Sequence, residues 1–298
     1  MFYNVVNVYR SVAGANSRRS MKTSLHFRIL SQPDELTCGP TCLQAVYRFF
    51  GDDVPLETVI ADIPSLDEGG TLAVLLGCHA LRRGYTATIY TFNLKVFDPT
   101  WFNGRRVLHA GQDLETSAQH WRRVARKGRE MRFQVGDDQA PQSEHLSDHQ
   151  KFLIERLSRQ QEIKESQKLK FACRSYAEFL SLGGQVAMHD LNTGLISHYL
   201  DRNIPVLTGL SATYLYRCER EIARNCKPDD VRGVPTGHFV VLSGYHPSKG
   251  TVSVADPYLA NPLGDENYYD VHVERLICAI LLGVITYDAN LLIVQPSP

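Results

Sequence analysis

Apolar residues return every three or four positions in the segment after residue 40, as they do on one face of a helix. The positions are Leu43, Val46, Tyr47 and Phe50. We therefore expect a helix that begins at or just after Cys38 and ends near Gly51, a residue type common at helix ends. A second apolar face, between Leu72 and His79, predicts another helix with Thr71 as its N-cap.

Later in the chain the apolar pattern becomes that of strands. Residues 85–92 are rich in aromatic and β-branched side chains, and residues 238–245 form a continuous apolar run. Further strands are expected at 204–210, 251–255, 268–273 and 291–294, and further helices at 174–182, 192–201 and 274–282. Because most helices precede most strands, the sequence predicts an α+β fold.

Residues 98–190 differ from the rest in being rich in Arg, Lys, Gln, Glu and His. We expect two helices here, at about 114–132 and 147–168, the first of them with a basic, solvated face. We interpret 98–190 as a helical insertion within a single domain of residues 25–298, preceded by an N-terminal tail of residues 1–24. The insertion is a candidate surface for selecting substrate or for binding a partner protein.

Charge and cysteine content exclude several classes of function. Lys and Arg together number 32, as do Asp and Glu, and this balance argues against a dedicated nucleic-acid binder. No apolar run approaches the ~20 residues of a membrane helix. Seven scattered cysteines do not suggest a disulfide scaffold, so we expect a reducing, cytoplasmic setting. Without a CxxC pair or a glycine-rich phosphate motif, we expect neither a metal site nor a cofactor.

Four residues form a candidate catalytic set. Cys38 at a helix N-terminus would feel the positive end of the helix dipole, which favours the thiolate. His238 could pair with that thiolate and protonate a leaving group, while Asp256 fixes the orientation of its ring. The Gln32 amide, with the N–H of Cys38, could stabilise an oxyanion.

The predicted strands give a geometric reason to pair two of these residues. His238 begins one apolar strand, and Asp256 follows the end of the next. A tight turn at 246–250 joins these strands, so antiparallel pairing would place the start of one beside the end of the other. The hairpin itself is therefore expected to bring His238 and Asp256 together.

Three stretches of sequence resemble the C39-like branch of the papain-like cysteine peptidases. They are Gln32-x5-Cys38-Gly39-Pro40-x-Cys42-Leu43, Gly237-His238-Phe239-Val240-Val241 and Val254-Ala255-Asp256-Pro257-Tyr258. The resemblance extends over residues 28–92 and 203–260, including Gly69-Gly70-Thr71. It implies a papain-like fold, with a helical half packed on a mostly antiparallel sheet. It also implies that Cys38 is the nucleophile, His238 the base, Asp256 the orienting residue and Gln32 the oxyanion donor.

The resulting hypothesis is a cysteine peptidase or amidohydrolase that acts on a peptide or amide substrate through a thioester acyl-enzyme. Two alternatives remain open at this point. The same residues could transfer the acyl group to an amine or thiol, as papain-like acyltransferases and transpeptidases do. The chain could also be a catalytically silent module that binds a peptide.

Overall fold

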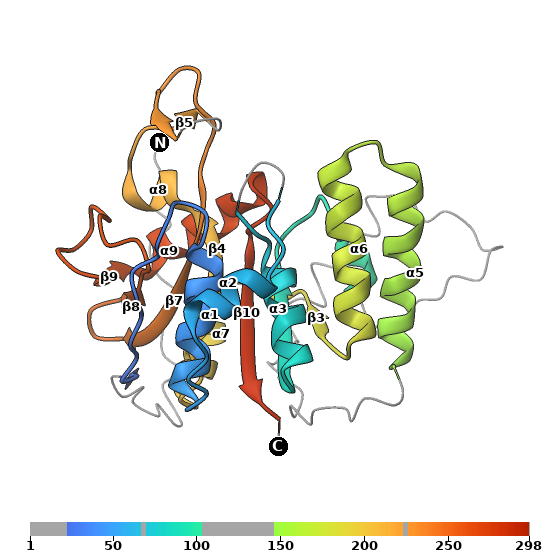
Figure 1. Cartoon of the computed structure of the whole chain (residues 1–298), viewed down its shortest axis with the longest axis horizontal. Coiled ribbons are helices and arrows are strands. Elements are labelled where there is room, and N and C mark those ends of the chain that lie inside the picture. The colour runs from blue at the N-terminus through green and yellow to red at the C-terminus, as the bar shows by residue number, and fades with distance from the viewer. Residues whose placement is uncertain (1–22, 67–69, 103–145, 223–225, 298) are drawn as a thin grey trace, which may run out of the picture.

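The computed structural model describes residues 23–66, 70–102, 146–222 and 226–297. Within these ranges the chain builds a mixed sheet with helices on both of its faces (Figure 1). The helices in the described ranges are either too short or too polar to cross a membrane. The expected α+β fold class is confirmed.

The main sheet has the strand order β3-β2-β10-β4-β7-β8-β9, with the short β1 paired to β7. Neighbouring strands are antiparallel except β2 and β3, which are parallel. The bounds are β1 Thr23–Ser24, β2 Tyr85–Thr91, β3 Gln185–Ala187, β4 Val206–Ser211, β7 Gly237–His246, β8 Thr251–Ala255, β9 Tyr268–His272 and β10 Asn290–Pro296. A separate two-stranded ribbon pairs β5 (Glu221–Ile222) with β6 (Lys227–Pro228).

Figure 1 shows α1 and α3 in front of this sheet, and α7 and α9 behind it. The bounds of the helices are α1 Cys38–Phe49, α2 Leu56–Asp62, α3 Ala73–Arg82, α5 Asp148–Ile163, α6 Gln167–Ser181, α7 Thr193–Leu200, α8 Ala212–Tyr216 and α9 Val273–Leu282. The described residues also form two short 3₁₀ turns, η1 Pro99–Phe102 and η2 Gly283–Ile285. The core lies between the sheet and these helices, because the strand residues that face them are buried aliphatic side chains.

Most expected elements are present within two residues of their predicted ends. The helix at Cys38 is confirmed, and Gly51 follows it with a φ of +86°. The N-cap of α3 is Leu72, so the assignment of Thr71 to that position was wrong. The Thr71 hydroxyl instead donates a hydrogen bond to the carbonyl of Pro64 at 3.2 Å.

The expected helices at 147–168 and 174–182 need correction. The chain forms α5 and α6 there, with a break at residues 164–166. Ser166 causes the break, because its hydroxyl accepts a hydrogen bond from the Leu169 N–H and thereby caps a new helix. The other expected helix, at 114–132, lies outside the described residues.

The segment at 146–190 is closely joined to the rest of the fold. The α5–α6 pair lies to one side of α3, and β3 adds a parallel strand beside β2 (Figure 1). The Phe179 ring is fully buried against Gly77 of α3, where an added Cβ would lie 2.6 Å from a ring carbon. The division into a core domain and a 98–190 insertion remains a prediction.

A loop after α9 packs against the ends of β4 and β7, next to His238. Asp288 in this loop is 5% exposed, and its Oδ1 atom has no hydrogen-bond partner among the described residues. An added Cβ at Gly237 would lie 2.2 Å from Asp288 Oδ2, so only glycine fits at the start of β7. Burial raises the pKa of Asp288 to about 7, although a hydrogen bond to Thr286 and the charges of Lys168 and His238 oppose the rise.

From the burial of the Asp288 carboxyl we expect a specific dependence of the free energy of unfolding on pH. Its pKa is about 7 in the folded chain and about 4 in an unfolded chain, so the folded state binds the additional proton between these values. The contribution of Asp288 to stability is therefore lost as the pH rises from about 4 to 7. Asp288→Asn does not titrate, so relative to the wild type it should gain stability over this interval, by at most about 4 kcal/mol.

Urea unfolding of both chains between pH 4 and pH 8 measures this difference. Asp230→Asn removes a carboxylate at an exposed position and is the matched control, which should show no such trend. A difference between Asp288→Asn and the wild type that stays constant with pH would contradict the prediction.

Candidate active site

Cys38 is the first residue of α1 and is 8% exposed. The first N–H groups of a helix have no partner within the helix, and the helix dipole is positive at this end. Close packing fixes the position of the residue, since an added Cβ on the adjacent Gly39 would lie 2.7 Å from Thr71 and 3.2 Å from the Phe239 ring. The thiol therefore occupies a rigid, electropositive position facing β7.

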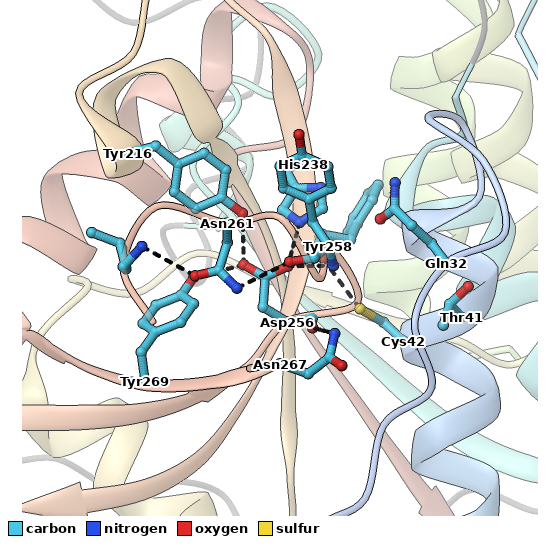
Figure 2. Close-up of polar contacts among 12 residues, drawn as sticks. Gln32, Thr41, Cys42, Tyr216, His238, Asp256, Tyr258, Asn261, Asn267 and Tyr269 are labelled. Atoms are coloured by element: carbon cyan, nitrogen blue, oxygen red, sulfur yellow. Dashed lines mark hydrogen bonds and ion pairs between the residues drawn. The ribbon is translucent and has the colours of Figure 1, made fainter. Parts of the chain in front are cut away.

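His238 lies on β7 and Asp256 directly follows β8, as the hairpin argument expected (Figure 2). The two strands pair through Val241 and Ala255, and His238 Nε2 is 2.8 Å from Asp256 Oδ1. The charge of Cys38 also acts on the His238 ring, so these two side chains lie near each other. The structure thus brings three of the four expected residues together in the order Cys38, His238, Asp256.

The pKa of His238 reflects two opposing effects. Burial of the ring disfavours the imidazolium and by itself would lower the pKa. The charges of Asp256 and Cys38, together with the hydrogen bond to Asp256, outweigh burial and raise the pKa of His238 to about 10. The surroundings of the ring therefore favour its charged form, and an imidazolium is the partner that a thiolate needs.

Asp256 is fully buried, so its charge depends on hydrogen bonds. Oδ1 accepts from His238 and from the backbone N–H of Tyr258 at 2.9 Å. Oδ2 accepts from the hydroxyls of Tyr216 at 2.6 Å and Tyr269 at 2.7 Å. Burial acts to raise the pKa of Asp256, but the His238 charge and these hydrogen bonds lower it below its usual value. Sequence reasoning did not identify either tyrosine.

Gln32 lies in the loop before α1, and that loop is joined to the loop after Asp256. The Gln32 backbone N–H donates to the Pro257 carbonyl at 2.9 Å. Its side-chain Nε2 donates to the Asp34 carbonyl at 2.8 Å, while Oε1 is buried without a hydrogen-bond partner among the described residues. An amide nitrogen carries two N–H groups, so the contact with Asp34 still leaves one to donate to a substrate. The hydrogen bonds of the described residues include none between this amide and Cys38.

A second cysteine near the site, Cys42, is held in the core. Cys42, one turn after Cys38, is fully buried and its thiol donates to the Phe239 carbonyl at 3.3 Å. Burial, with the nearby charges of Cys38 and Asp256, raises the pKa of Cys42 well above its usual value, so this thiol stays protonated. Within the described ranges, no three His, Cys, Asp or Glu side chains are arranged to hold a metal ion.

Comparison with known proteins gives a match in the second half of the chain. Residues 167–275 match the model of the Peptidase_C39 like family. No curated protein and no solved structure matches the chain. The matched range starts at α6 and contains His238 and Asp256, whereas Cys38 and Gln32 precede it. The resemblance expected from the motifs is thus confirmed, and across residues 167–275 this chain is similar to the C39-like peptidases.

Proposed function

We propose that this protein is a cysteine hydrolase that cleaves a peptide or amide bond through a thioester acyl-enzyme. The observation that carries the proposal is the position of the His238 ring, which lies near Cys38 and forms a hydrogen bond with the buried Asp256. A thiolate paired with an imidazolium is the resting state of an activated cysteine nucleophile. Asp256 would act as the orienting residue of this triad.

In the proposed reaction, Cys38 Sγ attacks the carbonyl carbon, and the π electrons of the carbonyl move to its oxygen. The N–H of Cys38 and the Gln32 amide would stabilise that oxyanion. The carbon–nitrogen bond then breaks, and the imidazolium of His238 gives its proton to the leaving amine. Water attacks the thioester, His238 takes a proton from it, and release of the acid restores the ion pair.

The helical segment beside α3 is our candidate for selecting the substrate. A cavity of about 420 Å³ opens between the loop before α3 and the α5–α6 pair. Its lining combines cationic, polar and apolar side chains, namely Ser65, Leu66, Gln161, Gln167, Lys168, Lys170, Phe171 and Arg174. We also assign the protein to a reducing compartment such as the cytoplasm, because all seven cysteines are free thiols.

Alkylation of Cys38 tests the proposed nucleophile directly. The ion pair with His238 should make Cys38 react with iodoacetamide at pH ~6, well below the ~8.5 at which a free thiol ionises. His238→Ala should slow this reaction at pH ~6 at least tenfold and restore ordinary thiol titration. Mass spectrometry of the digested chain separates Cys38 from the exposed Cys278, which serves as an internal reference.

A wild-type Cys38 that titrates like an ordinary thiol, and does so equally in His238→Ala, would contradict the proposed function. If Cys38 is activated, a p-nitrophenyl ester will form the acyl-enzyme. Its release by water then supports the hydrolase, and faster release by an added amine would instead indicate an acyltransferase.

The same ester isolates the role of Gln32. Gln32→Ala should slow acylation of Cys38 by about 10²-fold, because one oxyanion donor is lost. It should change the iodoacetamide rate little, since alkylation develops no oxyanion. The control is Gln185→Ala, an exposed glutamine on β3 that should leave both rates unchanged. Equal losses of both rates in Gln32→Ala would show that Gln32 supports the loop rather than the oxyanion.

A further inference from the structure

Two phenols meet on the oxygen of Asp256 that faces away from His238 (Figure 2). The hydroxyls of Tyr216 and Tyr269 donate to Oδ2 at 2.6 and 2.7 Å. With His238 and the Tyr258 N–H on Oδ1, the carboxylate accepts four hydrogen bonds, its full capacity. Because both oxygens are held, the carboxylate plane cannot rotate away from the His238 ring.

The two tyrosines come from elements outside the β7–β8 hairpin. Tyr269 lies on β9 and is 8% exposed, while Tyr216 is the last residue of α8. The residue after Tyr216, Arg217, has a φ of +56°, a left-handed conformation that is unfavourable for a side chain of this kind. The Arg275 guanidinium on α9 donates to the Leu215 carbonyl and holds this turn in place. The backbone is therefore locally strained next to Tyr216, at the point that directs its phenol to Asp256.

We propose that Tyr216 and Tyr269 are positioning residues of the triad, which hold Asp256 as an oriented anion so that His238 stays an imidazolium beside Cys38. This inference rests on the proposed function. The phenol hydroxyls act through Asp256, and the Tyr216 ring also lies against the His238 ring, with 6.0 Å between the ring centroids. Burial and the Asp256 charge raise the pKa of both phenols far above the usual value, so both remain donors over the whole working range.

Loss of a phenol has a defined electrostatic consequence. A hydrogen bond to a charged group contributes about 1.5–3 kcal/mol, which corresponds to one or two pKa units. Without it, the buried carboxylate is less stable and Asp256 takes up a proton at a higher pH. A protonated Asp256 has no negative charge to stabilise the His238 imidazolium. The ion pair between Cys38 and His238 would therefore be lost at a higher pH as the solution is acidified.

The experiment compares Tyr216→Phe, Tyr269→Phe and the double variant with the wild type. When the alkylation rate of Cys38 is plotted against pH, the rate falls at low pH with a midpoint on the acid side. Each single change should raise that midpoint by about one pH unit, and the double change should raise it further. Tyr268→Phe is the matched control, because its hydroxyl accepts a hydrogen bond from the Ile29 N–H instead. In an Asp256→Asn background, the same tyrosine changes should produce no additional shift.

A second readout separates this inference from the proposed function. In a Cys38→Ser chain, NMR resonances of His238 report the protonation of Asp256 without any reactive thiol. The midpoint on the acid side should rise in the two Phe variants and stay unchanged in Tyr268→Phe. If this shift occurs while wild-type Cys38 titrates as an ordinary thiol, the tyrosine inference holds and the proposed function fails.

Unchanged midpoints in chains that are merely less stable would overturn the inference, because they would show a packing role alone. Tyr269 is the more buried residue, so thermal unfolding of each variant is measured first. If Tyr269→Phe does not fold, the half-buried Tyr216 provides the decisive variant.

Discussion

A carboxylate with no exposed surface is the constraint on which the site depends. Burying an isolated charge costs far more free energy than a small domain has available, so the charge must be paired and hydrogen-bonded. Asp256 meets this requirement only because β7, α8, β9 and the chain after β8 each provide a hydrogen-bond partner for its carboxylate. The backbone carbonyl of Asn267 also fixes this residue, because it accepts a hydrogen bond from the Asp256 N–H at 2.8 Å.

Cys38 is held in place by close packing of α1. Gly39 allows α1 to approach α3 and β7 so closely that no side chain fits between them. The Cys42 thiol, one turn later, bonds to the Phe239 carbonyl and ties the same helix to the strand that carries His238. The geometry of the cysteine and the histidine therefore follows from one tightly packed contact between α1 and β7.

Sequence reasoning predicted those parts of the site that depend on local patterns. Both the helix at Cys38 and the β7–β8 hairpin are marked in the sequence by the pattern of apolar residues. The pairing of His238 with Asp256 then follows from the hairpin. Tyr216, Tyr269 and Asp288 have no such signal, because they reach the site through tertiary packing of α8, β9 and a loop. The paired tyrosines at 268–269 offered one clue, since alternation on a strand buries only one of them.

The order of these elements along the chain also governs when Cys38 and His238 can come together. His238 follows Cys38 by 200 residues, and a ribosome that adds about 5–20 residues per second needs roughly 10–40 s to cover that distance. During this time β7 has not been synthesised, so Cys38 has no histidine from that strand beside it. The arrangement of Cys38, His238 and Asp256 can therefore form only after synthesis of the C-terminal strands allows the sheet to close.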